Sequence, residues 1–466
     1  MLNFLPLEDK EEILDKYFQN QKDRFCDLSI GVKYMWRREY SIEYAVYNDT
    51  LVIKESSDEY DPSFYYPIGK DVEGALDQIE KYCKNQNLPL VFGCVSQENA
   101  KKLTERYPLC KDFFNRDWSD YVYDAQNFKT YSGKKFSGQR NHVNKFKKTY
   151  KNYCFEVINE QNFNEVVNFL HDYEVFNRVQ DQAKREEVEM VHDLLKNLSR
   201  LNQLAGVLKV NGSIVALSIG EIVGDCLIVH VEKALKDYSG AYPTMAQEFA
   251  LAFATEKVKF INREEDCGDD GLRTSKLQYH PTEIIDKYFV EVYTAFDKIV
   301  SPITIETERL VVCEIEEKDL KEYKNLSVDE ELNEFWGYDY KEDLNGKTPD
   351  EEYFYQFVNQ LKKGKEEYPV AVRLNGFLIG EVTLHGFDYQ GGVEIGFRIK
   401  KEYQNKGYAK ESVGALIEYA FNYLSVKKVK AKCYLQNQRS KNLLLGLGFV
   451  EIKKDQNYFH FEKTRN

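Results

Sequence analysis

The sequence predicts an α/β (α+β) protein made of three domains, each built around a mixed β-sheet. Its 466 residues exceed what one hydrophobic core usually supports, and about 150 residues per domain gives three. Strand-like and helix-like stretches alternate along the chain. Two Asn-Gly pairs, at 211–212 and 375–376, lie between alternating apolar runs and predict tight hairpins. We expect domain limits of 1–148, 149–300 and 301–466.

The composition is that of a soluble globular protein, with 42% apolar and 30% charged residues. The start "MLNFLPLEDKEE" has no leader pattern, and no stretch approaches the ~20 apolar residues of a membrane span, so we expect a cytoplasmic protein. Nine scattered cysteines without a CxxC pair predict reduced thiols and no metal site. A net charge of −13 opposes nucleic-acid binding by the surface as a whole.

The first two segments show their elements in order. In the first segment we expect strands within 40–48, 50–55 and 89–96, and helices near 71–85 and 97–107. In the second we expect a helix near 161–177, a hairpin region over 204–234 and a helix after Pro243.

The third segment has the clearest order. After "ITIETERLVVCEI" we expect a hairpin over 368–384, a strand at 392–399 and a helix over 408–424. One face of that helix is apolar, which predicts a buried stripe; its residues are Ala409, Val413, Leu416, Ile417, Ala420, Phe421 and Leu424. The chain then reads as a strand, a short helix closed by Gly448 and a last strand, "YFHFEKT".

The stretch "QNKGYA" at 404–409 joins the strand at 392–399 to this helix. Such a turn presents backbone N–H groups and the positive end of the helix dipole, which together suit a phosphate. Gly407 lets the backbone approach an anion closely, and Ala409 is also small. The context, with Asn437 and "GLGF" about 40 positions later, favours a phosphate-bearing cofactor.

That ordered set resembles the GCN5-related N-acetyltransferase (GNAT) superfamily, in particular the branch that acetylates N-termini of ribosomal proteins. The similarity covers most of 301–466 and implies acetyl-CoA as the donor. It implies that the pyrophosphate of coenzyme A binds the backbone amides of 404–409 and that its pantetheine chain pairs with the strand at 397–399. The implied cofactor residues are Phe397, Arg398, Ile399, Gln404, Asn405, Lys406, Gly407, Tyr408, Ala409 and Asn437.

An amine acceptor must lose a proton before it attacks the thioester, and Glu394 is our candidate base; a solvated strand residue is the alternative. Asn437 is a candidate to hydrogen-bond the pantetheine chain, and Ser440 is a candidate to protonate or stabilise the leaving thiolate. For each of them, a cap or turn at the start of a helix is the alternative. Leu444 stands where many members of the superfamily have a Tyr acid, so the acid stays unassigned. Trp336 and Tyr338 either line the acceptor pocket or belong to an aromatic core.

Three stretches of residues 1–300 resemble a second family, the soluble relatives of the C-terminal domain of phosphatidylglycerol lysyltransferases. They are "FFNRDWSDYVYDAQNFKTYSGKKFSGQRNHVNKFKKTY", "LIVHVEKALKDYSGAYPTMAQEFA" and "INREEDCGDDGLRTSKLQYHP". The resemblance implies a tandem pair of acyltransferase-like domains ahead of the GNAT domain. By position it implies Glu232 as an acidic catalytic residue and Arg273 and Lys276 as substrate-binding residues.

Polar residues near these positions have two interpretations. Asn262, Arg263, Glu264 and Asp266 form either part of a site or a salt-bridge network, and His230 is either catalytic or a satisfied strand histidine. The stretch from Lys129 to Lys151 carries eight Lys or Arg and no acid. It is either a solvated helix or a tRNA-binding face; the candidate phosphate contacts are Lys134, Lys135, Arg140, Lys145, Lys147 and Lys148.

No P-loop, GxSxG elbow or HExxH helix is present in the sequence, which disfavours nucleotide hydrolysis, serine hydrolysis and zinc chemistry. Three functional hypotheses follow. The first is acetyl transfer from acetyl-CoA to a primary amine on a small molecule, a peptide or a protein N-terminus. The second is aminoacyl-tRNA-dependent transfer by residues 1–300. The third is a coenzyme A-binding sensor or scaffold without catalysis.

Overall fold

The structure is a computed structural model that describes residues 2–7, 12–19, 21–58, 60–176, 182–336, 341, 344 and 349–465. It divides into two compact units. The first comprises 1–102 with 112–291, and the second 103–111 with 292–466. Over the described residues there are three mixed sheets, which confirms the predicted fold class.

The first sheet lies mainly in the first unit. Its order is β1 (Leu5–Pro6), β2 (Glu43–Tyr47), β3 (Thr50–Glu55), β4 (Ser63–Phe64), β6 (Leu90–Val95), β15 (Tyr288–Val292) and β7 (Cys110–Phe114), with β5 (Ile68–Gly69) pairing β3. Its helices are α1 (Glu12–Phe18), α2 (Ile30–Trp36), α3 (Val72–Gln86) and α4 (Gln97–Arg106). The strands and helices predicted between residues 40 and 107 are all present, within a few residues of the expected limits.

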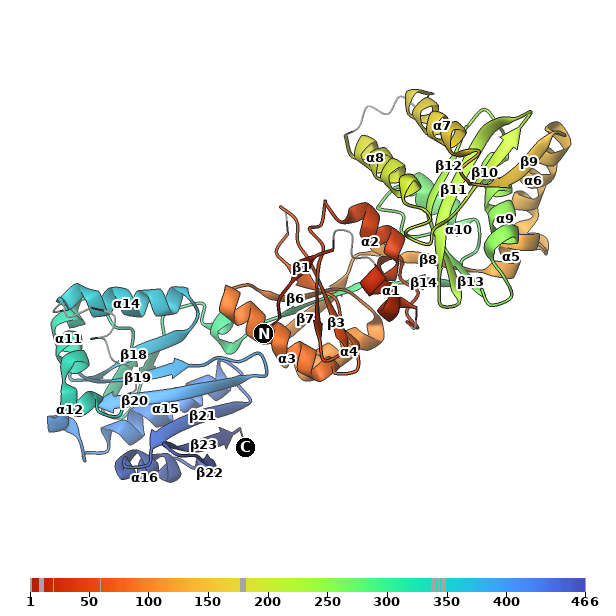
Figure 1. The fold of residues 1–466 in the computed structure, drawn as a ribbon. Coiled ribbons are helices and arrows are strands. Elements are labelled where there is room, and N and C mark those ends of the chain that lie inside the picture. The colour runs from red at the N-terminus through yellow and green to blue at the C-terminus, as the bar shows by residue number, and fades with distance from the viewer. Residues whose placement is uncertain are drawn as a thin grey trace. The chain divides into compact units, whose positions relative to one another are not determined.

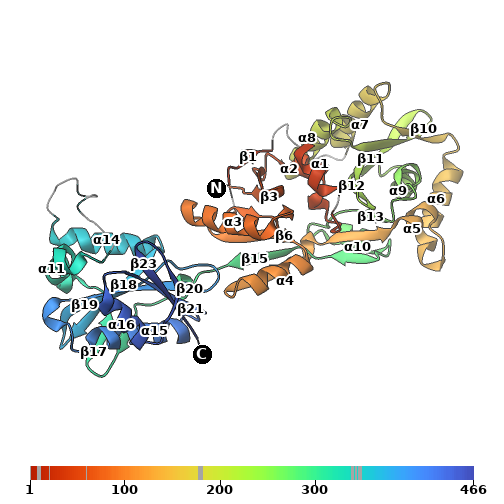
Figure 2. The same ribbon diagram turned by 60° about the horizontal axis from the view of Figure 1, so that its bottom comes forward.

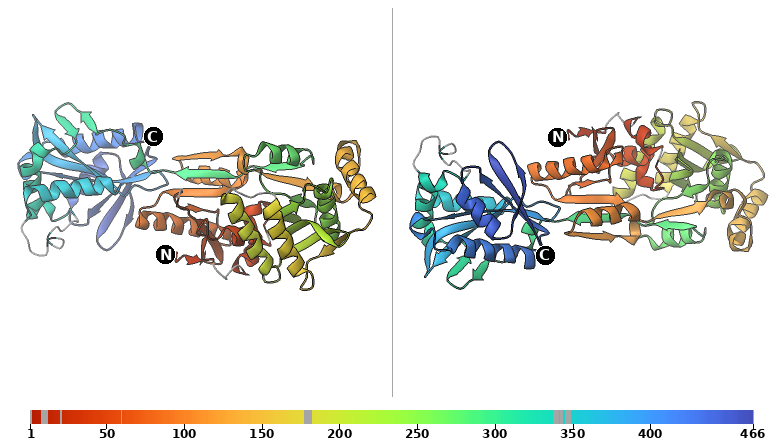
Figure 3. Two further views of the ribbon diagram at one scale, coloured as in Figure 1. Left: turned by 90° about the horizontal axis from the view of Figure 1, so that it is seen from above. Right: turned by 90° about the horizontal axis from the view of Figure 1, so that it is seen from below.

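One strand of the first sheet comes from far along the chain. β15 lies beside β6 (Figure 2), and Figure 3 shows this green strand among the orange ones. In exchange, β8 (Asp120–Asp124) belongs to the second sheet. Both sheets therefore take strands from either side of residue 148, which the sequence offered as a domain limit.

The second sheet also lies in the first unit. Its order is β14 (Glu283–Ile285), β8, β13 (Phe260–Asn262), β12 (Cys226–Ala234), β11 (Ser213–Val223), β10 (Leu204–Val210) and β9 (Tyr153–Val157). Its helices are α5 (Ala125–Thr130), α6 (Ser137–Thr149), α7 (Phe163–Phe176), α8 (Gln182–Lys196), α9 (Ala241–Phe253) and α10 (Asp270–Leu277). Asn211 and Gly212 both have positive φ, at 51° and 82°, and close the predicted hairpin between β10 and β11.

Helices cover both faces of the second sheet (Figure 1). On one face, Phe128 of α5, Phe146 of α6 and Phe249 of α9 share a core with Leu208. On the other face, α7 and α8 join a core that also contains residues of α1 and α2. The first and second sheets are therefore tied together by buried apolar contacts.

The third sheet makes up most of the second unit. Its order is β16 (Thr304–Glu306), β17 (Leu310–Cys313), β18 (Glu367–Leu374), β19 (Phe377–His385), β20 (Gly392–Ile399), β21 (Lys428–Tyr434), β23 (Tyr458–Thr464) and β22 (Val450–Lys454). Its helices are α11 (Leu320–Val328), α12 (Glu330–Asn333), α14 (Glu351–Lys363), α15 (Tyr408–Asn422) and α16 (Gln438–Gly446). The stripe of α15 is buried as predicted, since Val413, Leu416 and Ala420 are all 0% exposed.

Candidate functional site

The predicted phosphate loop forms an open helix N-terminus. Gly407 is the N-cap of α15, with φ at 86° and no side-chain cap. Two hydrogen bonds from Arg309 hold the loop in place, one to the carbonyl of Lys406 (3.0 Å) and one to the carboxylate of Glu411 (2.7 Å). The backbone N–H groups at the start of α15 are therefore presented on a fixed turn, as an anion site requires.

The strand before this loop separates from its neighbour. β20 pairs β19 from Glu394 to Ile399, but among the described residues it pairs β21 only from Gly392 to Glu394. Phe397, Arg398 and Ile399 lie in the unpaired part of that edge. Apart from the carbonyl of Ile399, which accepts a hydrogen bond from Gln404, their backbone groups on the β21 side are available to an extended ligand chain that would add to the sheet like a further strand.

Side chains of the loop mostly stabilise its own shape. Gln404 donates to the carbonyl of Ile399 (2.9 Å), and Lys406 to that of Glu402 (2.9 Å). Asn405 has a positive φ of 59°. Tyr408 and Ala409 pack against the core of the third sheet. What the loop offers a ligand is therefore chiefly backbone N–H groups.

Arg398 is a buried structural residue as far as its side chain is concerned. Its guanidinium donates to Glu381 (2.8 Å) and to Ser327 (3.2 Å). The ring of Trp336 covers it at 4.4 Å and also lies beside Gly396. Trp336 therefore sits on the same sheet face as Glu394. Tyr338 lies outside the described residues.

Glu394 belongs to a polar row that the sequence did not reveal. The pairing register places Glu367 of β18 opposite His385 of β19, and His385 opposite Glu394 of β20. Glu394 forms an ion pair with Lys432 (3.1 Å), and Glu367 accepts a hydrogen bond from Thr383 (2.7 Å).

The environment shifts the pKa values of Glu367 and His385 in opposite directions. Burial raises the pKa of Glu367 to about 7. Burial also lowers the pKa of His385, although the nearby carboxylate of Glu394 partly offsets the effect. The row therefore places an imidazole of lowered pKa opposite a carboxyl group that titrates near neutral pH, which is an arrangement able to accept or pass on a proton. No local sequence signal identifies Glu367 or His385, because only the sheet register brings them together.

Asn437 and Ser440 adopt the cap geometry. The side chain of Asn437 accepts from the backbone N–H of Ser440 (3.0 Å) and begins α16. Leu444 is fully buried in the core. Its side chain is therefore part of the packing of the third sheet, and the general acid stays unassigned.

In the second sheet, internal contacts hold the three residues that the resemblance to phosphatidylglycerol lysyltransferases implied, which are Glu232, Arg273 and Lys276. Glu232 forms an ion pair with Arg263. Lys276, 6% exposed, donates to the backbone carbonyls of Arg263, Glu264 and Glu265, and burial lowers its pKa. Arg273 donates to both carboxylate oxygens of Asp266 (2.9 and 2.7 Å) and also to Asp117 (2.6 Å).

The neighbouring polar residues are also engaged. Asn262 donates to Asp120 (2.7 Å) and accepts from the N–H of Glu264 (2.7 Å). His230 lies between Glu221 (3.0 Å) and Glu264 (2.8 Å). Burial alone lowers the pKa of His230, but the two hydrogen-bonded carboxylates raise it to about 9. Both ring nitrogens of His230 are therefore occupied.

Cys26, Asp120 and Glu265 lie close enough to share a metal ion. The ammonium of Lys287 already contacts all three, at 3.2, 2.8 and 3.5 Å. Its buried positive charge takes the place that a metal ion would occupy.

The basic stretch runs from the end of α5 through a short turn into α6. Lys134, Lys135, Lys145 and Lys148 are exposed. Arg140 donates to the backbone carbonyls of Tyr131 and Gly133, and Lys147 pairs with Glu248 (2.8 Å). Four of the six predicted phosphate contacts are thus free to meet an anionic partner, and two have structural roles.

In the described part of the chain, no helix is both long and apolar enough to cross a membrane. Two family profiles match the sequence. Residues 19–291 match "Phosphatidylglycerol lysyltransferase, C-terminal", and residues 309–450 match "Acetyltransferase (GNAT) domain".

Individual relatives each match a part of the chain. An uncharacterised N-acetyltransferase of Bacillus subtilis, YnaD, is 29% identical over 31% of this chain and 81% of its own length. A second one, YjdG, is 28% identical over 26% and 76%. A solved structure of a conserved protein of unknown function from Bacteroides thetaiotaomicron is 30% identical with a TM-score of 0.60. The matched region is 63% of this chain and 100% of the Bacteroides chain.

Proposed function

The chain belongs to the family of the phosphatidylglycerol lysyltransferase C-terminal domain and carries a GNAT domain after it, which makes it an acyltransferase; from this premise we propose that the third domain transfers an acetyl group from acetyl-CoA to a primary amine. The open N-terminus of α15 behind Gly407, beside the unpaired edge of β20, carries the proposal. The diphosphate of coenzyme A binds the N–H groups of 404–409, and its pantetheine pairs with 397–399.

The acceptor is a primary amine on a small molecule, a peptide or a protein N-terminus. It approaches on the face of Trp336, and Glu394 takes its proton directly or through water, within the row of His385 and Glu367. The amine nitrogen then attacks the thioester carbonyl and the thiolate of coenzyme A leaves. Ser440, at the start of α16, is our candidate to assist that leaving sulfur.

Calorimetry of the full chain with acetyl-CoA tests the donor. We expect Gly407→Glu to abolish binding, because it places a carboxylate at the anion site. Gly407→Ala carries the same backbone strain, since φ is 86°, but no charge, and should retain most of the affinity. Gly138→Glu, at an exposed position with open space around it, controls for added charge. Failure of the wild-type protein to bind at millimolar acetyl-CoA would sink the proposal.

Turnover over a panel of amines separates an enzyme from the sensor hypothesis, since a sensor binds acetyl-CoA without releasing coenzyme A. The aminoacyl-tRNA hypothesis for residues 1–300 rests on the family match and on the exposed lysines of α6. The internal bonds of Glu232, Arg273 and Lys276 give it no open catalytic group at those three positions.

A further inference from the structure

The first sheet repeats the plan of the acyl-donor site. In the third sheet, β20 pairs β19 antiparallel and β21 parallel, with α15 crossing between them and α16 following. In the first sheet, β4 pairs β3 antiparallel and β6 parallel, with α3 crossing between them and α4 following. The pairing of β4 with β6 is a single bridge, Phe64 to Phe92, so this pair of strands also separates early.

The helices that follow the two parallel strands begin in the same way. Asn437 accepts from the N–H of Ser440, three residues on, at the start of α16. Ser96 likewise accepts from the N–H of Asn99 (3.4 Å) at the start of α4. Ser96 and Asn99 therefore occupy the places of Asn437 and Ser440 in the first sheet.

The two crossing helices differ at their N-termini. α15 begins at Gly407 without a side-chain cap. α3 begins at Asp71, whose carboxylate accepts from the N–H of Gly74 (3.0 Å) and from the side chain of Asn48 (2.8 Å). The anion site at the start of α3 is filled by the protein's own carboxylate, which repels a phosphate. The first sheet therefore does not repeat the coenzyme A site.

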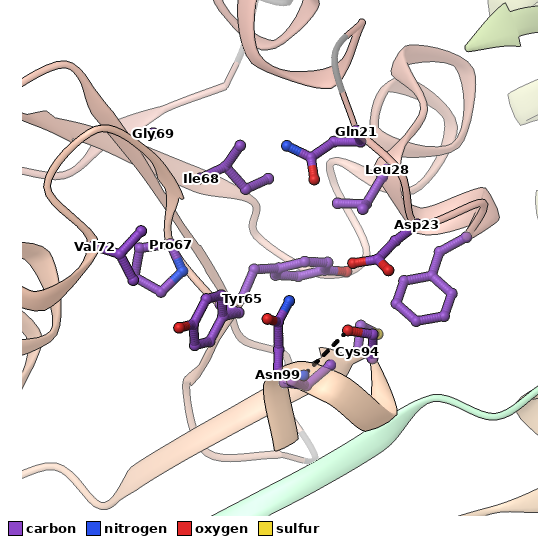
Figure 4. Close-up of a pocket in the computed structure, with 14 residues that line it drawn as sticks. Gln21, Asp23, Leu28, Tyr65, Pro67, Ile68, Gly69, Val72, Cys94 and Asn99 are labelled. Carbon is purple, nitrogen blue, oxygen red and sulfur yellow. Dashed lines mark hydrogen bonds between the residues drawn. The ribbon is translucent and has the colours of Figure 1, made fainter. Parts of the chain in front are cut away.

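A cavity of about 210 Å³ lies at this place in the first sheet. Figure 4 shows the carboxylate of Asp23 and the amides of Gln21 and Asn99 turned toward the same space, with Ile68 and Leu28 beside it. Since a 150 Å³ apolar cavity holds benzene, this one accommodates a ligand of roughly five to eight non-hydrogen atoms.

The hydrogen bonds of the amides leave acceptors and donors for a ligand. Gln21 uses its amide nitrogen to donate to the carbonyl of Tyr17 (3.3 Å), which leaves its oxygen as an acceptor. Asn99 uses its oxygen to accept from Lys102 (3.0 Å), which leaves its N–H groups as donors.

Asp23 is the charged group of this cavity. Burial raises the pKa of its carboxyl, while a hydrogen bond from Ser96 works against that shift. No described Lys or Arg forms an ion pair with Asp23, and the nearby Lys102 is paired with Glu98 (2.8 Å). The charge of Lys102 lowers the pKa of Asp23 and that of Glu98 raises it, so this ion pair acts on Asp23 in both directions. A partly buried carboxylate without an ion pair of its own favours a bound cation that restores the charge balance.

We propose that this cavity, between the β4–α3 turn and the start of α4, binds a small primary ammonium compound through Asp23. The ammonium donates to Asp23 and to the Gln21 oxygen, and the alkyl part packs on Ile68 and Leu28. The site lies wholly in the first unit and does not depend on acetyl transfer by the third domain.

Titration of the full chain with n-butylammonium chloride at low salt, followed by ligand-observed NMR, tests the site. We expect millimolar binding by the wild type and at least tenfold weaker binding by Asp23→Asn, which keeps the shape and removes the charge. Asp237→Asn, an exposed position in the turn after β12, makes the same charge change elsewhere and should leave the affinity unchanged. n-Butanol and n-butyrate should not compete.

Ile68→Phe fills the cavity without touching the carboxylate, and we expect it to abolish binding too. If circular dichroism shows that Asp23→Asn does not fold, Ile68→Phe is the variant that tests the site. Wild-type affinity in Ile68→Phe or in folded Asp23→Asn, or binding of n-butanol as tight as that of n-butylammonium, would overturn the proposal. Gly407→Glu should bind n-butylammonium normally, so failure of the acetyl-CoA site would not be mistaken for failure of this one.

Discussion

The ammonium of Lys287 and the carboxylate of Asp120 lie 2.8 Å apart inside the first unit, with 2% and 0% of their side chains exposed. Lys287 comes from the residues just before β15 and Asp120 begins β8, so the pair connects the two strands that the first two sheets exchange. Lys287 also forms an ion pair with Asp27 (2.5 Å). Burial lowers the pKa of Lys287, but Asp120 and Asp27 raise it far above its usual value.

Lys287→Met should therefore destabilise the first unit strongly. It leaves buried carboxylates without their counter-charge, and removal of one partner from a buried pair typically costs about 3–5 kcal/mol. Urea unfolding followed by circular dichroism measures the change. The exposed Lys257→Met serves as control and should change stability by less than about 0.5 kcal/mol. A loss below about 1 kcal/mol for Lys287→Met would show that the carboxylates find other partners.

His230 predicts a dependence of stability on alkaline pH. Its pKa rises from an ordinary value near 6.5 to about 9 in the folded protein. A raised pKa means that the folded state holds the proton more tightly, so the stabilisation is complete below pH 6.5 and is lost as pH rises through 9. The wild type should lose about 3 kcal/mol over this range.

In His230→Gln that fall in stability should be much smaller. Urea midpoints measured at half-unit intervals from pH 6 to 9.5 provide the comparison. His142→Gln, an exposed histidine of α6, is the matched control and should retain the wild-type profile. Parallel curves for wild type and His230→Gln would contradict the assignment.

Glu394→Gln should lower kcat for acetyl transfer by about 10²–10⁴, the usual contribution of a general base. The KM for acetyl-CoA should stay near its wild-type value, because the proposed donor site consists of backbone groups of 397–399 and 404–409, not of the Glu394 side chain. Steady-state kinetics with the best amine of the panel measures both. Glu418→Gln, exposed on α15, is the control. A change in kcat of less than threefold would show that Glu394 is a solvated strand residue and does not accept the proton.

The lysines of α6 provide the test of tRNA binding. If residues 1–300 use charged tRNA, replacing Lys134, Lys135 and Lys145 together by Gln should weaken binding and flatten its salt dependence, since each lost phosphate contact removes about one unit of slope. Filter binding over 50–200 mM salt measures both. Arg140 is unsuitable for this test because its guanidinium holds the Tyr131 and Gly133 carbonyls. Unchanged affinity and slope would exclude α6 as the binding face.

Much of the local structure could be predicted. Asn211-Gly212 and Asn375-Gly376 close hairpins because both residues of each pair accept the positive φ that such turns need. The apolar spacing from Val413 to Phe421 placed the buried face of α15. The cap of α16 by Asn437 and the open turn at Gly407 follow from the same short-range preferences.

Long-range relationships could not be predicted in this way. The position of β15 in the first sheet and the approach of Lys287 to Asp120 depend on strand pairs far apart in the chain. Glu367 and His385 lie in one hairpin, but a register shift between Val372 and Arg373 helps to set which residues are opposed there. A one-residue change of register would turn every such side chain to the other face, and no local pattern records it.

The sequence by itself determined the elements of this protein, its two family resemblances and the turn that suits a phosphate, because these depend on neighbours within a few residues. Only the tertiary structure decided which charges meet. It bound Glu232, Arg273 and Lys276 into internal contacts and left Asp23 facing a cavity, because burial and partnership are properties of packing between distant segments.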